Sequence, residues 1–383
     1  MKISKIMLLA LCSLPIVGCS DKSDEPNEAS TKELMLKAAT EAYVDHTVLP
    51  TYQAMADAAI EMRDLCHAMQ EKHAAGTLAE SDVKAAGEAW KMARKHWELS
   101  EAFLFGPAAN HNIDPHIDSW PLDKAAMENL LVQIRSGNSW SLENNGGYGL
   151  IGFHSVEYML FQLSEDENTS LVHSIDYAPE ELEYLVAVAD DLCQQCVCLE
   201  ACWAGTANVS AAKREILADA ELDYSEEYGW EMKNAGQPGS RFKTYQEAAE
   251  EIIQGCIDIA DEVGSTKIGR PHIGSSVEDK NYIESPYSLN SIEDFADNIR
   301  SVRNAYMGSR SGDASVSDYV KSVDAAADAE VRQAIDNAIA AIELVPEPFA
   351  KNATGALSEA AMKATGETLV DALEKAMAAV TSH

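Results

Sequence analysis

Residues 90–105 read WKMARKHWELSEAFLF, and the spacing of their apolar side chains decides the fold. Trp90, Trp97 and Leu104 recur at helical spacing, so they lie on one face of an amphipathic α-helix. Glu101 interrupts this apolar face. A carboxylate inside a core needs a ligand or a cationic partner, and Arg94, one to two turns earlier, is the candidate for a purely structural pair.

The same three- and four-residue periodicity continues along most of the chain, whereas alternating strand patterns are nearly absent. Glycine and proline stand near the expected helix ends, as at Gly76, Gly106 and Pro179. We therefore expect an all-α protein. The expected helices span residues 32–48, 52–75, 81–105, 123–136, 148–163, 179–203, 242–263, 292–306, 316–344 and 357–380.

A weak internal repeat indicates how these helices are grouped. The tripeptide Thr-Tyr-Gln opens a long helix at residues 51–53 and again at 244–246, and each is followed by a helix end closed by glycine, at 101–106 and 304–308. Long helices of this kind form antiparallel bundles. The pattern predicts two related antiparallel bundles packed side by side, the product of an internal duplication.

The N-terminus is typical of an exported protein. Residues 1–18 combine a basic start with a short apolar stretch and resemble a bacterial lipoprotein signal that ends before Cys19, the expected lipidation site. A secretory signal with an unrelated cysteine is the alternative. Residues 19–33 are polar and acidic, as expected of a flexible tether. The two bundles would then span 34–205 and 206–383, on a protein anchored by lipid in a bacterial cell envelope, periplasmic or surface-exposed.

The charge of the chain restricts its partners. Its 383 residues include 63 acidic and 29 basic ones, a formal net charge of −34. Nucleic-acid affinity depends mostly on Lys and Arg neutralising phosphates, so no nucleic-acid partner is expected. The acids are spread along the chain, which indicates a solvated acidic surface and leaves cations or cationic ligands as candidates.

Four cysteines near the middle of the chain are spaced C-x-x-C-x-C-x-x-x-C. Cys193 and Cys196 fall on the apolar stripe of the 179–203 helix, which favours packing in the core. A disulfide and a metal cluster remain as alternatives for Cys193, Cys196, Cys198 and Cys202, although the spacing matches neither paired zinc knuckles nor ferredoxin ligation.

A polar pair stands in a helix that is apolar all round. In Gly152-Phe-His154-Ser-Val-Glu157, the i,i+3 spacing puts His154 and Glu157 on one helical face. The apolar residues on the opposite face indicate that this helix is buried. We predict that His154, Glu157 and Glu101 converge on one buried polar site; a mutually satisfied structural pair is the alternative.

Other residues are expected around this site. The loop at 106–122 carries Asp118 and Trp120, which together with Trp97 suit the rim of a binding site. A turn capped by Asp118 is the alternative. From the second half, the repeat predicts that Arg303, Asn304 or Tyr306 approaches the His154 helix, with loops 106–122 and 263–290 over the site. Core packing of Tyr306 and a solvated Arg303 form the alternative.

At these residues the chain resembles the imelysin family of exported bacterial proteins. The resemblance covers nearly all of the chain after the tether. It implies an all-helical duplicated bundle, a site at the junction of the halves and an association with iron acquisition, and the family is classed among metallopeptidases. The matching segments are W-E-x-S-E-A-F-x-F-G-P at 97–107, I-D-x-W-P at 117–121, G-x-H-x-x-E at 152–157, S-P-Y-S at 285–288 and N-x-x-x-x-x-x-x-Y-x-G at 298–308.

Taken together, these features favour a binding protein that captures iron, haem or another metal-bearing ligand. His154, Glu157 and Glu101 would hold the metal, iron or zinc, and other envelope uptake proteins would be partners. A zinc-dependent metallopeptidase using the H-x-x-E motif and a protein-interaction module are the alternatives. The motif supplies only two groups, and the sequence contains no H-E-x-x-H, so a peptidase would lack an assigned general base.

Overall fold

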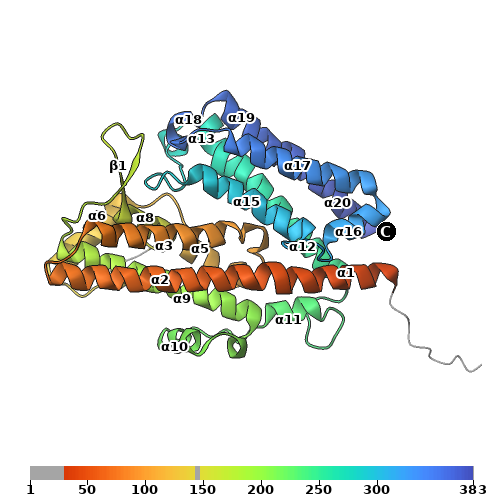
Figure 1. Ribbon diagram of the computed structural model, residues 1–383, viewed down its shortest axis with the longest axis horizontal. Helices are drawn as coiled ribbons and strands as arrows, with labels where there is room; N and C mark the ends of the chain where they lie inside the picture. Colours follow the sequence, from red (N-terminus) through yellow and green to blue (C-terminus); the bar gives the residue numbers. More distant parts are fainter. Residues whose placement is uncertain (1–29, 143–146, 383) are drawn as a thin grey trace, which may run out of the picture.

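A computed structural model describes residues 30–142 and 147–382. The expected signal at 1–18, Cys19 and most of the tether lie outside these residues, so the lipid anchor stays a prediction. The described chain is all-α, as predicted, except for a small antiparallel sheet of β1 (Phe161–Leu163) and β2 (Ser170–Val172), in which Gln162 pairs with Leu171. Two helical bundles lie side by side (Figure 1).

The described chain begins with one long continuous helical rod that packs against both bundles. It consists of α1 (Thr31–Ala42), a π-helical turn η1 (Tyr43–Val48) and α2 (Leu49–Ala74), which follow one another without a break (Figure 1). Pro50, which lacks a backbone N–H, closely follows the π-helical turn, where the regular α-helical hydrogen bonding is already interrupted. α2 packs against α3 and α9 of the first bundle, whereas α1 packs against α12 and α16 of the second.

The first bundle is built around α2, α3 (Glu80–Glu98), α8 (Gly152–Leu160) and α9 (Pro179–Ala204). Two expectations are corrected here. The helix predicted to reach residue 105 ends at Glu98, and the one predicted to reach 163 ends at Leu160, where β1 begins. The smaller elements are η2 (Glu101–Phe103), α4 (Pro107–Asn110), α5 (Ile113–Ile117), α6 (Lys124–Arg135), η3 (Tyr148–Leu150), η4 (Thr206–Asn208), α10 (Ala211–Asp219) and α11 (Tyr228–Lys233).

The second bundle contains the remaining helices. The predicted loop at 263–290 is largely helical, because α12 continues through η5 and α13 as far as Ile273. Asp324 divides the predicted 316–344 helix, and its side chain caps the second part. The elements are α12 (Tyr245–Glu262), η5 (Val263–Ile268), α13 (Gly269–Ile273), α14 (Val277–Lys280), α15 (Ser291–Met307), α16 (Val316–Val323), α17 (Ala325–Glu343), α18 (Phe349–Asn352), α19 (Ala356–Lys363), η6 (Ala364–Leu369) and α20 (Val370–Ser382).

Two of the π-helical turns, η5 and η6, pack directly on each other. A Cβ atom on Gly264 would lie 2.4 Å from the Cα atom of Gly366. Only glycine allows this approach, and it fixes the backbone that carries Lys267 into the interior. The internal duplication of the two bundles stays a prediction.

The six described cysteines, Cys66, Cys193, Cys196, Cys198, Cys202 and Cys256, are buried free thiols. Burial raises the pKa of the Cys193 thiol to about 11 and that of Cys66 to about 12, so both are neutral near pH 7. Packing in the core is therefore the role that the structure supports for the C-x-x-C-x-C-x-x-x-C stretch. None of the described helices is long and apolar enough to cross a membrane.

Candidate ligand site at the bundle junction

Arg94 is the centre of a buried charged network between the bundles. Its side chain lies in α3 and is fully buried. A guanidinium group offers five donors, so it can serve several carboxylates at once. Two of its partners belong to the first bundle and two to the second. Nη2 lies 2.6 Å from Glu98 and 2.5 Å from Glu284, Nε lies 3.3 Å from Asp294, and Nη1 pairs with Asp118.

Lys267 supplies the second buried cation, from the π-helical turn η5. Only 1% of the residue is exposed. Its ammonium lies 3.1 Å from Glu284, 3.4 Å from Glu101 and 3.6 Å from Glu98, and it stands 5.3 Å from the ring centre of Trp120. A π-helical turn widens a helix locally, and such turns are frequent at functional sites.

These contacts correct the sequence-based pairing of Arg94 with Glu101. The structure pairs Arg94 with Glu98, four residues on in the same helix, and Glu101 with Lys267. The reason is that α3 ends at Glu98, where the Ser100 hydroxyl donates to the Trp97 carbonyl oxygen at 2.7 Å. Glu101 therefore lies in η2 and not on the apolar face of α3, where the sequence pattern had placed it.

Asp118 lies where the loop after α5 meets α3. Its Oδ2 accepts a hydrogen bond of 2.7 Å from the Trp97 indole, and its Oδ1 pairs with Arg94 and lies 3.0 Å from His154 Nε2. Trp97 thus holds Asp118 from a fully buried position. Burial raises the pKa of Asp118, but Arg94 and His154 outweigh it and hold that pKa well below the usual range.

His154 and Glu157 lie on one face of α8, as predicted, and both are buried. His154 Nδ1 lies 3.3 Å from Glu157 Oε2. The other oxygen, Glu157 Oε1, accepts hydrogen bonds from the Tyr287 N–H at 2.9 Å and from the N–H and hydroxyl of Ser288, both at 2.7 Å. Glu157 is therefore satisfied by His154 and by a loop of the second bundle.

The other ring nitrogen of His154, Nε2, has no hydrogen-bond partner in the described chain. Nε2 faces Asp118 at 3.0 Å, but the two are not aligned for a hydrogen bond. Burial favours the neutral ring, yet Asp118 and Glu157 outweigh it and raise the pKa of His154 to about 9. The imidazole is thus protonated near neutral pH in this arrangement.

The second bundle reaches the network through α15. Asn298 donates to Glu98 Oε2, and the Ser301 hydroxyl accepts from the Ala102 N–H at 3.0 Å. The residues predicted from the repeat follow Ser301 in the same helix, two to five residues on. Asn304 is half-buried. Arg303 pairs with Asp336 at 2.6 Å, and the Tyr306 hydroxyl donates to Asp328 at 3.3 Å.

The segment before α15 contacts the His154 helix through Tyr287 and Ser288. Arg303 and Tyr306 bind acids of α17 instead. The repeat aligned two helix ends that close on glycine. The network instead uses the side of α15 that packs against α3 and η2.

Two pockets open beside this network. The smaller, of about 180 Å³, is lined by four carboxylates, Glu101, Asp114, Asp118 and Glu262, and by Trp120. Burial, with a contribution from Asp118, raises the pKa of Asp114 to about 7. Burial also raises the pKa of Glu101 and Glu262, since the low polarity and the neighbouring acids disfavour their charged forms.

The larger pocket has a volume of about 620 Å³ and reaches the network at His154 and Glu157. His154 and Glu157 line its inner end, Tyr287 and Lys124 line its side, and Trp120 belongs to both pockets. The Lys124 ammonium lies 4.7 Å from the ring centre of Tyr287. Trp120 therefore separates two openings onto the same group of buried charges.

Four groups of three side chains in the described chain could hold a metal ion, and one of them, at the bundle junction, combines a histidine with two carboxylates. Ligand atoms of Asp118, His154 and Glu284 lie within 4.8 Å of one another. An imidazole nitrogen with two carboxylates is a donor set that suits iron, zinc or manganese. Glu284 Oε2 is buried and has no hydrogen-bond partner in the described chain. Arg94 binds both carboxylates, so an entering cation would compete with it.

Several members of this site were not found from the sequence. Lys267 gave no signal, because a lysine in an expected loop is normally solvated. Glu284 and Asp294 flank the S-P-Y-S segment, and Glu98 and Asn298 lie inside quoted motifs, but none of the four was assigned a role. Contacts between the two bundles join residues that are far apart in the chain. Asn298 and Glu98, for example, are separated by 200 positions. Periodicity cannot reveal such pairs.

Fold and site together define a two-bundle, all-helical protein with a buried charged site at the bundle junction. The chain belongs to the imelysin family, whose model matches residues 48–380. It is 28% identical to iron-regulated protein A of Synechococcus elongatus over 281 residues, 73% of this chain and 67% of that protein.

Solved structures agree with this assignment. A crystal structure described as an iron-regulated protein A precursor from Parabacteroides distasonis superposes with a TM-score of 0.76 at 27% identity, covering 92% of this chain and 97% of that one. An imelysin-like protein from Psychrobacter arcticum superposes with a TM-score of 0.56 at 14% identity, covering 91% and 94%. The second likeness supports the fold alone.

Proposed function

We propose that this protein captures a metal ion, iron first among candidates, at the bundle junction. The relatives named as iron-regulated proteins motivate the choice of iron. Asp118, His154 and Glu284 would hold the ion. Glu157 would not be a ligand: it would orient His154 from behind, as a second carboxylate does for metal-binding histidines. The acidic pocket with Glu101 at its edge would be the entrance.

The observation that carries this proposal is an excess of buried carboxyl groups over buried cationic groups. Six carboxylates of the network are buried, and only three cationic groups are buried with them. Unpaired buried carboxylates are costly unless they are protonated or bind a cation. The acids are Glu98, Glu101, Asp118, Glu157, Glu284 and Asp294, and the cations are Arg94, His154 and Lys267.

Arg94 can give up two of its carboxylate partners and still have its positive charge balanced by the other two. It now contacts four carboxylates, and Glu98 and Asp294 would remain when a metal ion took Asp118 and Glu284. The proton on His154 would leave as Nε2 became a ligand. Capture would then exchange one proton and two ion pairs for metal–ligand bonds.

The pocket volumes favour an ion over a large chelate at the acidic entrance. Pockets for organic ligands measure about 300–1,000 Å³, whereas the acidic pocket measures about 180 Å³. Haem or another metal-bearing organic ligand would have to use the 620 Å³ pocket on the His154 side. The two entrances give distinct predictions, because Asp114 and Glu262 line only the acidic one.

Peptidase activity is less well supported by this geometry. A metallopeptidase needs a general base beside the metal. Glu157 is engaged by three hydrogen bonds from Tyr287 and Ser288 and by His154, so it would have to break this set to accept a proton from water. We therefore do not expect peptide hydrolysis, and we include its measurement among the tests below.

The test is metal binding by protein purified without a histidine tag. Iron(II), iron(III) and zinc(II) would be offered in turn, and bound metal counted by elemental analysis and calorimetry. We expect one ion per chain, with binding weakened at least about tenfold in Asp118→Asn and in Glu284→Gln, since each variant loses an anionic ligand. Glu88→Gln, which changes the same charge on the exposed face of α3, is the control.

Equal affinity in all four proteins would refute the junction as the metal site. Binding of haem but not of free ions would move the function to the larger pocket. Peptide cleavage that a chelator abolishes would favour the metallopeptidase. A partner protein that binds Asp118→Asn as well as the wild type, with no metal bound to either, would favour an interaction module.

We also propose that the capture domain is held at a membrane by lipid on Cys19. The lipoprotein-like signal at 1–18 supports this proposal, under which the site would lie outside the cytoplasm. Cys19→Ser should move the protein from the membrane to the soluble fraction and remove the acyl mass. Retention of the variant in the membrane fraction at unchanged mass would contradict the anchor.

A further inference from the structure

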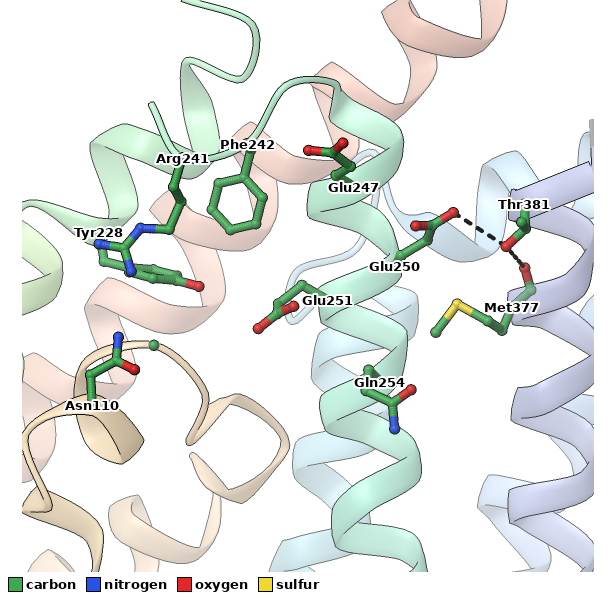
Figure 2. A pocket seen from close by; sticks show the side chains of 11 residues that line it. Asn110, Tyr228, Arg241, Phe242, Glu247, Glu250, Glu251, Gln254, Met377 and Thr381 are labelled. Atoms are coloured by element: carbon green, nitrogen blue, oxygen red, sulfur yellow. Dashed lines mark hydrogen bonds between the residues drawn. The ribbon is translucent and has the colours of Figure 1, made fainter. Parts of the chain in front are cut away.

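A larger pocket, of about 760 Å³, lies at another place where the two bundles meet. Its walls come from both halves of the chain: Asn110 follows η2, Tyr228 lies in α11, and α12 and α20 form the far side (Figure 2). None of its lining residues belongs to the network around Arg94. This pocket is therefore separate from the metal site proposed above.

One wall is a polar stripe of α12. Glu247, Glu250, Glu251 and Gln254 line the pocket, and their spacing places them on one side of the helix. None of the three glutamates forms an ion pair within the described chain, although Glu247 accepts from the Lys243 N–H at 2.7 Å and Glu250 accepts from Thr381 at 3.2 Å. Burial, with Asp258 nearby, raises the pKa of Glu251.

The single cation of the pocket is already neutralised. Arg241 contacts Glu226 at 2.5 Å and Glu231 at 2.9 Å, and its guanidinium lies 4.4 Å from the ring centre of Tyr228. It therefore anchors the wall opposite α12 and does not compensate the stripe. The pocket as a whole keeps an excess of acceptors and negative charge.

Tyr228 gives the second, independent indication of a ligand. Only 2% of the residue is exposed, and it packs between Trp203 and Phe242. Its hydroxyl forms no hydrogen bond with any described residue, and it points into the pocket on the side of Glu251 (Figure 2). The hydroxyl oxygen is not among the buried polar atoms without a partner, so it is open to the pocket and can accept a hydrogen bond from a bound donor.

The described acceptors of this pocket do not form a group of three closely spaced metal ligands. The four groups of metal-ligating side chains whose donor atoms lie within 4.8 Å of one another are all outside this pocket, among the described residues. Residues one helical turn apart have Cβ atoms about 5–6 Å apart, so glutamates at this spacing can receive two separate cationic groups. Ammonium groups joined by a short methylene chain match this spacing, and Phe242 and Met377 offer apolar surface to the methylenes.

We propose that this pocket binds a linear organic cation with at least two primary ammonium groups, a di- or polyamine. One ammonium would donate to Glu251 and to the Tyr228 hydroxyl, and the next would lie beside Glu247 or Glu250. The ligand would contact both bundles at once, because Tyr228 belongs to α11 and the glutamates to α12.

The experiment is calorimetry with spermidine and putrescine on the protein and three variants at fixed ionic strength. We expect one spermidine per pocket in the wild type. Glu251→Gln should weaken binding about tenfold or more, and Tyr228→Phe should weaken it severalfold, since a hydrogen bond to a charged group is stronger than one between neutral groups. Glu88→Gln, with the same change of net charge elsewhere, should bind as the wild type does.

Two further measurements separate a built site from general attraction to an acidic protein. Tetramethylammonium, which has charge but no N–H donors, should not displace spermidine at equal ionic strength. Metal binding at the junction should be unchanged in Glu251→Gln. The proposal is overturned if Glu251→Gln and Tyr228→Phe, with wild-type melting temperatures, bind spermidine normally, or if Glu88→Gln weakens binding as much as Glu251→Gln does.

Discussion

Arg94 and Glu284 are 190 positions apart in the chain, and their charged groups meet at 2.5 Å. Both side chains are fully buried. Glu284 Oε1 is also 3.1 Å from Lys267, so one carboxylate connects a helix of the first bundle to a π-helical turn of the second. The position of the two bundles relative to each other therefore depends on charge compensation as well as on apolar packing.

Loss of Arg94 should be strongly destabilising. Arg94→Met would leave Glu98, Asp118, Glu284 and Asp294 without their shared partner. Removing one side of a buried ion pair costs about 3–5 kcal/mol. Chemical denaturation measures the loss. Arg303→Met removes an exposed pair with Asp336 and should cost less than about 1 kcal/mol. Similar losses in the two variants would show that the network contributes little.

Glu157→Gln should destabilise the protein, even though the change is nearly isosteric. The carboxylate accepts two backbone N–H groups and a hydroxyl from the loop before α15, and an amide NH₂ would face some of these donors. An unsatisfied buried group costs about 1–3 kcal/mol. The melting temperature should fall, while Glu88→Gln leaves it unchanged. A variant as stable as the wild type would indicate that the Glu157 carboxylate serves a ligand and does not stabilise the loop before α15.

Asp114 should make stability depend on pH. Burial and Asp118 raise the pKa of its carboxyl from about 3.8 to about 7, so the folded state binds this proton more tightly than the unfolded one. The contribution is fully present below the unfolded pKa and is lost as the pH rises through about 7. Asp114→Asn should therefore match the wild type near pH 4 and melt at a higher temperature at pH 8. A lower melting temperature at pH 8 would contradict the shift.

Gly264→Ala should disturb the junction through the backbone. Its Cβ would lie 2.4 Å from the Gly366 Cα, a distance that forces η5 and η6 apart. Lys267, three residues on, would then lose its contacts with Glu284 and Glu101. We expect a clear fall in melting temperature and weaker metal binding. Gly147→Ala is the control, because a Cβ there meets nothing within 4 Å. Equal behaviour of the two variants would argue against the close approach.

Local patterns determined the helical fold and part of the site. The apolar stripe through Trp90 and Trp97 predicted a buried helix face, and the i,i+3 pair in the 152–157 segment predicted His154 and Glu157 on a shared face of a buried helix. Both follow from the period of the α-helix alone, so no distant residue is needed to recognise them.

Only the tertiary structure decided how the charges are paired. Glu101 pairs with Lys267 because α3 ends before it, and Lys267 faces inward because Gly264 and Gly366 let two π-helical turns meet. Such pairings depend on where helices end and on which backbones approach closely, and a shift of one turn replaces one partner by another. That is why the repeat pointed to Arg303 and Tyr306, whereas the network contains Asp294 and Asn298 from the same helix.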